Sequence, residues 1–406
     1  MKVNGARLRA DLESLARIGR NKDGGIDRTA FSAEDAAARA WYKQRCDDTG
    51  LEVRCDGLGN MVAGTADSWD CPAIWSGSHV DTVPDGGPLD GALGSVAALE
   101  CVRRLAEEGL QLTHPVQSVV FSDEEGNYSH LFGSYGMVHG YDESRLASMT
   151  GRAGDALTAV LQRFPWRSGG PENRHDVSRV RQFVELHIEQ GPIMEQRGIP
   201  IGVVTSIVGL GGGEIVFSGR ADHAGTTPMT MRRDPGRAAG AFLTRLWAIA
   251  ASAGDGAVVT CGRIAFSPGG SNVVPEEATL LLDFRSPHGE QVEALGEALS
   301  RAAQECAADH DVECTVRLDQ PVSPVGLDEH VRDTIRSAAG SQGLPTIDIP
   351  SGAGHDSQNM ARIAPTGMIF VPSHEGRSHS RFEHTDPDLL ENGANVLLET
   401  LISLAR

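Results

Sequence analysis

The stretch from Ser76 to Leu93 places one imidazole and several carboxylates in a glycine-rich connection, including His79, Asp81 and Asp90. Neutral imidazoles and ionised carboxylates are ligands suited to zinc, manganese and similar divalent ions. A lone His-x-Asp pair is weak evidence for a metal, because a histidine in a loop is usually only solvated or hydrogen-bonded. The stretch therefore predicts a metal site only if further ligands reach the same place.

Later segments offer such ligands, namely Glu124, Glu125, His187 and His379. An isolated Glu-Glu pair is more often a solvated acidic turn. Two adjacent carboxylates point in different directions, however, so one can bind a metal while the other faces the water bound to that metal. All of these residues fall at expected strand ends or in glycine-rich loops, which favours one shared site.

Buried strands that end just before these residues would position them. Residues 73–75 are typical of the end of such a strand, and apolar residues between 93 and 105 then recur at helical spacing. Two more buried strands are expected at 116–122 and 183–191, and alternation in the latter places His187 opposite its apolar face. Open α/β sheets bind ligands where a strand leads into a helix. Further helices are expected at 5–20, 33–49, 330–341 and 389–404, and further strands at 51–56, 59–64 and 368–371.

From residue 207 the pattern changes to β-α-β-β-α-β, which is typical of a ferredoxin-like sandwich. The expected elements are 214–219, 236–251, 257–266, 278–284, 290–309 and 313–318. We therefore expect one α/β domain, 1–206 plus 319–406, interrupted by a smaller α+β domain, 207–318. The run Gly209-Leu-Gly-Gly-Gly213 does not match the dinucleotide fingerprint and indicates a hinge or a strand start where other groups approach closely.

Composition limits the partners and the compartment. The 406 residues carry 36 Lys+Arg against 55 Asp+Glu, a formal charge of −19, which disfavours nucleic acid and anionic membranes as partners. The seven cysteines form no Cys-x-x-Cys pair and are typical of a reducing compartment. The first residues lack the apolar region of a secretion signal, and no stretch is apolar for long enough to cross a bilayer. We expect a cytoplasmic enzyme with a small-molecule substrate.

Over nearly its whole length the chain resembles the hydantoinase/carbamoylase branch of the binuclear-metal amidohydrolases related to aminoacylases and carboxypeptidases. The motifs that carry the resemblance are Gly77-Ser-His-Val-Asp-Thr-Val83, Gly86-Gly-Pro-Leu-Asp-Gly91, Asp123-Glu-Glu-Gly126, Glu185-Leu-His-Ile-Glu-Gln-Gly191, Asp222-His-Ala-Gly-Thr-Thr-Pro-Met229, Ser271-Asn-Val-Val-Pro275, Gly352-Ala-Gly-His-Asp356 and Ser378-His379. The resemblance implies a mixed-sheet catalytic domain for two metal ions, with an inserted ferredoxin-like lid and dimerisation domain.

The resemblance also implies a role for each candidate ligand. Asp90 would bridge two divalent ions, zinc or manganese with cobalt and nickel as further options. One ion would be completed by His79 and His187, and the other by Glu125 and His379. His384 follows the same strand as His379 and competes with it for the last position, but the spacing Ser-His-x-x-x-Glu favours His379.

The same resemblance makes Glu124 the general base and places Asp81 beside His79, from which it would accept a hydrogen bond. It further implies a cis peptide between Asp90 and Gly91.

Substrate-binding residues follow from the resemblance as well. Arg285 at a strand end would clamp a substrate carboxylate. Gln190 and Asn272 would hydrogen-bond the ureido or carboxylate end, and His355 after Gly354 would help to close the pocket. His223 would stabilise the oxyanion from the partner subunit, which implies a homodimer joined through the inserted domain.

The activity expected is hydrolysis of an N-carbamoyl-L-amino acid to the amino acid, ammonia and carbon dioxide. No nucleophilic serine or cysteine is needed, since no Gly-x-Ser-x-Gly elbow is present and no cysteine lies within the motifs. Hydrolysis of allantoate or ureidoglycine is an alternative with the same mechanism, and a non-catalytic homologue that binds a ureido or amino-acid ligand is another. A peptidase or N-acyl amino-acid deacylase is less favoured, because Asn272, Gln190 and His223 suit a compact polar head group.

Overall fold

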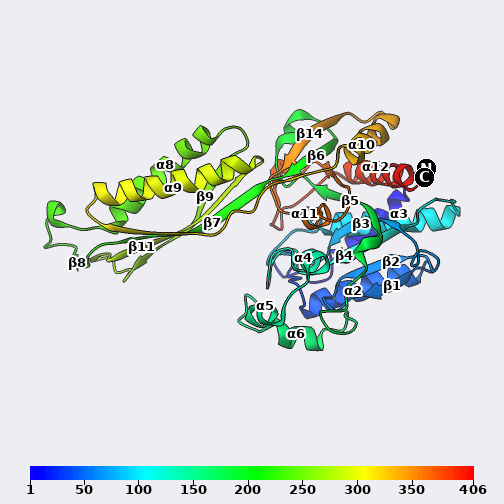
Figure 1. The fold of residues 1–406 in the computed structure, drawn as a ribbon, viewed down its shortest axis with the longest axis horizontal. Coiled ribbons are helices and arrows are strands. Elements are labelled where there is room, and N and C mark those ends of the chain that lie inside the picture. The colour runs from blue at the N-terminus through cyan, green and yellow to red at the C-terminus, as the bar shows by residue number, and fades with distance from the viewer. The chain divides into compact units, whose positions relative to one another are not determined.

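The computed structural model describes residues 1–406, which divide into two compact units. The first unit comprises Met1–Thr205 and Gly326–Arg406, and the second comprises Ser206–Val325 (Figure 1). The sequence placed the corresponding boundaries after residues 206 and 318. A bilayer-spanning helix is not present, since none combines the necessary length with the necessary apolar character.

A mixed nine-stranded sheet forms the centre of the first unit. Its strands lie in the order β1 (Glu52–Cys55), β2 (Met61–Gly64), β4 (Val116–Phe121), β3 (Ala73–His79), β5 (Val180–Ile188), β15 (Thr366–Val371), β6 (Ile201–Ile207) and β13 (Val325–Gly326), and β14 (Thr346–Ser351) pairs with β6. The four neighbours β4, β3, β5 and β15 run parallel, whereas β1–β2, β2–β4 and β15–β6 are antiparallel. Parallel strands are covered on both faces, which explains why β3, β4 and β15 are buried along their whole length.

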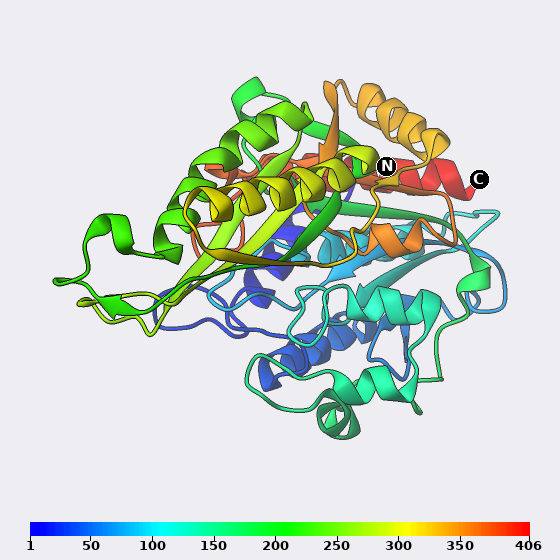
Figure 2. The ribbon, with the colours of Figure 1, turned by 60° about the vertical axis from the view of Figure 1, so that its left-hand side comes forward.

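Helices cover both faces of this sheet (Figures 1 and 2). One face packs against α3 (Ala92–Glu108), α10 (Glu329–Ser341) and α12 (Pro387–Ala405), and α1 (Gly5–Leu15) lies on α3 and α12. Val184, Leu186 and Ile188 of β5 belong to that core, as the alternation predicts. The opposite face of β5 carries His187 and packs near α4 (Phe132–His139) and α11 (Ser357–Met360). The remaining helices are α2 (Ala33–Asp47), α5 (Glu143–Ser148), α6 (Leu157–Arg163) and α7 (Ile193–Arg197).

The carboxyl ends of the four parallel strands meet at one edge of the sheet, because neighbouring parallel strands run in the same direction. Four segments leave this edge: the loop from His79 to α3, the loop after β4, the end of β5, and residues 372–386 after β15. Each of them carries residues that the sequence singled out as ligands.

The second unit is a four-stranded antiparallel sheet with two helices on one face (Figures 1 and 2). Its elements are β7 (Gly209–Ser218), α8 (Pro235–Ala253), β9 (Val258–Ser267), β11 (Glu277–Ser286), α9 (Gly289–Asp309) and β12 (Glu313–Leu318), with strand order β12-β7-β11-β9. The element order is the one expected for a ferredoxin-like sandwich. The glycine run begins β7, and a Cβ atom at Gly211 would overlap the ring of Phe284, so this strand start permits a close approach.

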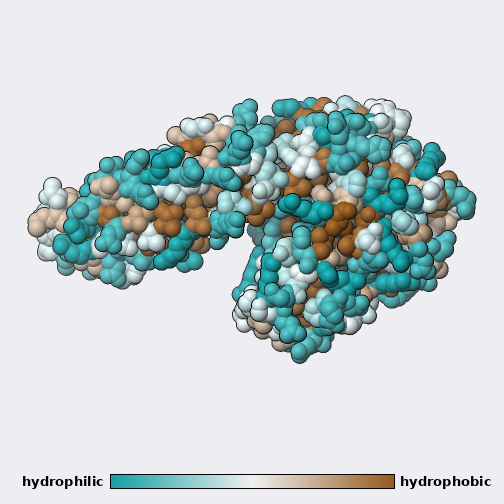
Figure 3. All heavy atoms as spheres, in the orientation of Figure 1, coloured by the Kyte–Doolittle hydropathy of each residue, from teal (hydrophilic) through white to brown (hydrophobic).

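Apolar side chains also reach the surface of the second unit, where brown residues lie among hydrophilic ones (Figure 3). Trp247 on α8 is 87% exposed, and Val258, Ile264 and Phe266 of the edge strand β9 are exposed as well. An unpaired strand edge with apolar side chains can pair with another chain.

Candidate metal centre

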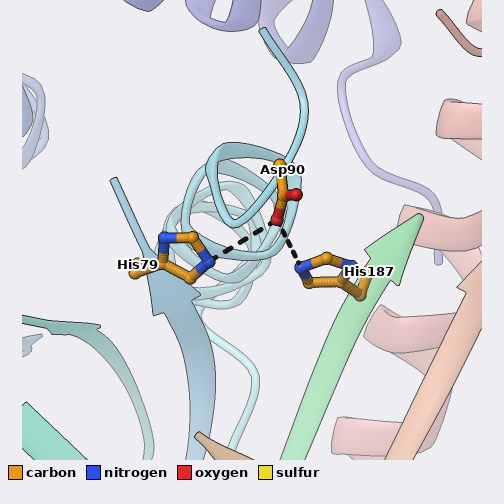
Figure 4. Close-up of side chains that lie close together, drawn as sticks. All are labelled: His79, Asp90 and His187. Atoms are coloured by element: carbon orange, nitrogen blue, oxygen red, sulfur yellow. Dashed lines mark ion pairs between the residues drawn. The ribbon is translucent and has the colours of Figure 1, made fainter. Parts of the chain in front are cut away.

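Asp90 lies at the centre of the gathered ligands (Figure 4). Its Oδ1 is 3.1 Å from Nε2 of His187 and 3.7 Å from Nε2 of His79. Figure 4 shows both imidazoles directed at this one carboxylate, His79 from the end of β3 and His187 from β5. The three side chains are buried, and their potential ligand atoms lie within 4.8 Å of one another.

The other oxygen of Asp90 belongs to a second group. Oδ2 is 3.3 Å from Nε2 of His379, and that nitrogen is 3.4 Å from Oε2 of Glu125. Here too the potential ligand atoms lie within 4.8 Å of one another. The structure therefore brings all five expected metal ligands together as two groups of three that share Asp90.

The imidazoles of the first group present the nitrogen that a cation requires. Nδ1 of His79 is 3.0 Å from the main-chain oxygen of Asp81, and Nδ1 of His187 is 2.9 Å from that of Ile188. A carbonyl oxygen only accepts, so Nδ1 carries a hydrogen in both rings, and Nε2, which faces Asp90, is the nitrogen that would bind a cation once it is deprotonated. Such a bond fixes the tautomer of a metal-binding histidine.

The position of Asp81 requires a correction to the expected hydrogen bond. His79 donates to the main-chain carbonyl of Asp81, while the carboxylate oxygen Oδ1 lies 3.7 Å from Nδ1. The other oxygen accepts the main-chain N–H of Glu125 at 3.2 Å. The main-chain carbonyl of Asp81 lies nearer to the His79 ring than the Asp81 carboxylate does, so the carbonyl accepts the hydrogen bond from the imidazole. The carboxylate instead holds the turn at Glu124 and Glu125.

The expected cis peptide between Asp90 and Gly91 is also wrong. The only cis peptide joins Ser267 to Pro268. The chain turns into α3 at Gly91, which has φ 63° and serves as the N-cap residue. Glycine adopts this left-handed conformation without a steric penalty, so the turn is made with a trans peptide.

Glu124 lies beside the first group. Its Oε2 is 3.6 Å from Nε2 of His79, and the side chain is buried. Burial, followed by the charge of Glu125, raises the pKa of Glu124 well above the usual value. A carboxylate with a raised pKa is a stronger base, and once protonated it keeps the proton closer to neutral pH, as a group that acts first as base and then as acid requires.

Accumulated negative charge is the main electrostatic property of the centre. Burial and then the carboxylate of Asp90 raise the pKa of Glu125 to about 8. Burial alone would lower the pKa of His187, but the Asp90 carboxylate outweighs it and raises the value to about 9. The hydrogen bond to Asp90 likewise raises the pKa of His379 to about 9. Divalent cations would offset this repulsion between carboxylates, so the donor set fits a pair of them.

His379, not His384, belongs to the second group. The His384 ring lies 6.0 Å from that of His374, and the His384 main-chain oxygen accepts the N–H of His374. His384 lines a separate cavity together with Glu195. The two histidines therefore point to different sides of the segment 372–386.

Three of the expected substrate-binding residues lie in the first unit. Nε2 of Gln190 donates to Oδ2 of Asp90 at 2.8 Å, while its Oε1 is buried without a hydrogen-bond partner. His355 is buried with its ring 4.5 Å from that of His187, and its Nε2 lies 2.8 Å from the hydroxyl of Ser351. Gly354 precedes His355, and a Cβ atom at position 354 would overlap the side chain of His130. The structure therefore places Gln190 and His355 against the ligands, and Gly354 next to them in the chain.

The other expected substrate-binding residues lie in the second unit. His223 pairs with Val273 in a two-stranded ribbon of β8 (Asp222–His223) and β10 (Val273–Val274), and the main-chain oxygen of Asn272 accepts the N–H of Ala224 at 3.0 Å. His223 and Asn272 are thus neighbours. Nδ1 of His223 accepts main-chain N–H groups at 2.9 and 3.2 Å, which leaves Nε2–H as a donor. Arg285 is the residue before the last one of β11 and donates to Asp283 through Nε at 2.9 Å.

The sequence did not reveal the supporting roles of three residues around the centre, of which Glu185 and Glu383 are buried and Ser378 is partly buried. Glu185 accepts the hydroxyls of Ser78 at 2.7 Å and Ser357 at 2.6 Å, which occupies both of its oxygens. The Glu185 carboxylate also lies near His187 and His355. Its oxygens, however, are already occupied by the hydrogen bonds from Ser78 and Ser357. Ser378 and Glu383 contact the Asp90 loop. All three residues fall within the motifs and the Ser-His-x-x-x-Glu spacing quoted above, but only side-chain contacts reveal their roles.

The part of the chain that carries these residues matches a known protein family. Residues 75–403 match the model of "Peptidase family M20/M25/M40". The chain belongs to this family. As a member of it, the chain is 37% identical to the N-carbamoyl-L-amino-acid amidohydrolase of Paenarthrobacter aurescens over 410 residues, covering all of this chain and 99% of that one. It is also 32% identical to the allantoate amidohydrolase of Bacillus subtilis (strain 168), covering 97% and 96% of the two chains.

Among solved structures, the fold of this M20-type chain is similar to a hydantoinase/carbamoylase family amidase from Burkholderia multivorans. The TM-score is 0.90 at 33% identity, covering all of this chain and 98% of the other. This similarity confirms the mixed α/β architecture.

Proposed function

We propose that the protein is a metal-dependent amidohydrolase that hydrolyses the carbamoyl C–N bond of N-carbamoyl-L-amino acids to the amino acid, carbon dioxide and ammonia. The observation that carries the proposal is the division of Asp90, whose two carboxylate oxygens face two different ligand groups beside Glu124. Four of the full-length relatives at 31–37% identity are N-carbamoyl-L-amino-acid amidohydrolases.

His79, His187 and Oδ1 of Asp90 would hold one divalent ion, and Glu125, His379 and Oδ2 would hold the other. Nitrogen and carboxylate donors accept zinc, manganese, cobalt or nickel. When bound, such ions lower the pKa of a water molecule and polarise the carbonyl oxygen of the ureido group.

Glu124 is the general base of the proposed reaction. It takes the proton of the attacking water and later delivers it to the departing nitrogen. The raised pKa of Glu124 suits the second step, because the carboxyl group retains the proton until the nitrogen leaves. Asp81 supports the base indirectly by holding the main-chain N–H of Glu125.

Residues of both units bind the substrate in this proposal. Arg285 pairs with the substrate carboxylate, and Asn272 and Gln190 bond the polar end. The Nε2–H of His223 donates to the developing oxyanion. Gly354 and His355 line the pocket next to His187.

We further propose that the protein is a homodimer in which the partner subunit supplies His223. The exposed apolar residues of the edge strand β9 and the exposed Trp247 support an interface on the second unit. A cytoplasmic location is supported by the seven cysteines, all of which are unpaired thiols.

The reaction is tested by incubating the metal-loaded protein with N-carbamoyl-L-amino acids and, in parallel, with allantoate, while ammonia release is measured. We expect turnover of the carbamoyl compounds. Turnover of allantoate alone would contradict the substrate assignment, and no metal-dependent turnover of either would favour a ligand-binding homologue.

The base is tested with Glu124→Gln, which keeps the size of the side chain but removes its ability to take a proton. We expect kcat to fall by about 10²–10⁴-fold, while elemental analysis finds the same metal content. Retained turnover would contradict the role of Glu124.

A further inference from the structure

A buried carboxylate connects the Asp90 loop to the segment that carries His379. Oε1 of Glu383 accepts the main-chain N–H of Leu89 at 2.7 Å and that of Asp90 at 3.0 Å. Its Oε2 lies 2.9 Å from the hydroxyl of Ser378. All three contacts are buried or partly buried, so water does not replace them readily.

Ser378 extends this connection to the ligands. Its hydroxyl is 2.9 Å from Oδ2 of Asp90, and the next residue in the chain is His379, whose Nε2 is 3.3 Å from the same oxygen. Glu383 therefore touches both the main chain of Asp90 and the residue that precedes His379. Its position fixes the separation of two ligands that lie nearly 300 residues apart in the sequence.

The Asp90 loop is shaped to admit this carboxylate. A Cβ atom at Gly87 would overlap the carboxyl group of Glu383. A side chain at position 87 would have to displace Glu383, so glycine at this position and glutamate at 383 depend on each other.

The two ligand groups differ in how much they need such a connection. His79 and His187 are buried at strand ends, and main-chain carbonyls fix their rings. The side chain of His379 is 52% exposed. The residue lies in a loop, and its backbone has a φ angle of 52°. The second group therefore depends on contacts that hold the loop, and Glu383 makes three of them.

We propose that Glu383 is a positioning residue that holds His379 at the distance from Asp90 at which the second group binds its cation. The inference rests on the proposed two-cation function. It assigns to Glu383 control of one cation site, with little influence on the site of His79 and His187.

The test is a titration of metal-depleted protein with Co²⁺, followed by calorimetry and by elemental counting of bound ions. In Glu383→Ala we expect one ion to bind as in the unaltered protein and the other to bind about 10–100-fold more weakly. Glu383→Gln retains an acceptor for the two main-chain N–H groups and should restore most of the lost affinity. Equal affinity of both ions in folded Glu383→Ala and in the unaltered protein would overturn the inference.

Glu195→Ala is the matched control. Glu195 bonds the same segment, accepting the N–H of Glu375 at 2.7 Å and pairing with Nδ1 of His374 at 2.8 Å, but it contacts none of the five ligands. This variant should bind both ions normally. An equal loss in Glu195→Ala would show that any loosening of the segment suffices, which would overturn a specific role for Glu383.

Gly87→Ala keeps the inference testable if Glu383→Ala does not fold. The added methyl group should displace Glu383 and weaken the same ion, and normal binding of both ions would overturn the inference. Failure of the unaltered protein to bind two ions would instead contradict the proposed function, so the two failures are distinguishable.

Discussion

The two ligand groups that share Asp90 are built in different ways. His79 and His187 lie at the ends of adjacent parallel strands, are almost completely buried, and donate to main-chain carbonyls. Glu125 and His379 lie in loops, and His379 is half exposed. A strand end provides position through the sheet, whereas a loop ligand requires side-chain contacts. If the proposed two cations bind, the second should therefore be lost more easily, and its affinity should change more readily on mutation.

Removal of the shared residue should have the largest effect, because Asp90 contributes one oxygen to each group. We expect Asp90→Ala to lose both ions and to reduce hydrolysis below detection. Elemental analysis and an ammonia assay measure the two effects. If the variant kept either ion at full occupancy, the shared role of Asp90 would be wrong.

Single histidine substitutions separate the groups. His187→Ala should remove the first ion and also lower the thermal midpoint, since it empties a buried position and leaves a cavity. His379→Ala should weaken the second ion while leaving the midpoint nearly unchanged. Thermal unfolding of the metal-free proteins, together with Co²⁺ titration, would detect both effects. Equal destabilisation by the two variants would remove the distinction between a strand-end and a loop ligand.

Competition between protons and cations for the ligand atoms should also distinguish the two groups, with a smaller effect than the histidine substitutions. In the first group burial lowers the pKa of His79 to about 4, whereas the Asp90 carboxylate, against burial, raises that of His187 to about 9. In the second group the pKa values of Glu125 and His379 are raised to about 8 and about 9. At pH 7 the first group must therefore release about one proton and the second about two, since cations bind the deprotonated forms.

Each proton displaced weakens binding about tenfold per pH unit below the pKa. Affinity should thus fall as the pH is lowered from 7 to 6, by roughly tenfold for the first ion and roughly a hundredfold for the second. Calorimetry in buffers with different ionisation enthalpies counts the released protons. The same slope for both ions would contradict this assignment.

The smallest effect is expected for Asp81→Asn. The His79 ring donates to the main-chain oxygen of residue 81, which the substitution keeps. We expect the first ion to bind within about tenfold of its original affinity. A larger loss would show that the carboxylate acts on His79 directly.

The gathering of the five candidate ligands was predictable from the sequence because their residue types follow buried strands in recognisable motifs. The carboxyl ends of β3, β4, β5 and β15 meet at one edge of the sheet, so residues that follow these strands in the sequence lie close together in space. The choice between His379 and His384 also agreed with the motif spacing. The element order of the second unit followed from alternation of strand and helix patterns.

Other features depended on contacts that no local pattern contains. Glu383 bonds residues nearly 300 positions away, and the partner of His79 is a main-chain atom. Helix α4 has glycines at 133 and 136 and little amphipathic character, so its sequence gave no helical signal. The first helix was expected to reach residue 20 but ends at Leu15.

Strand β15 occupies an interior position in the sheet, between β5 and β6, although it comes from the last 41 residues of the 406. A nascent chain that ends before it leaves β5 and β6 each without the partner on one side and lacks His379, the fifth candidate ligand. During synthesis the proposed metal centre is therefore completed only after residue 379 has been added, and products that end before β15 should be inactive.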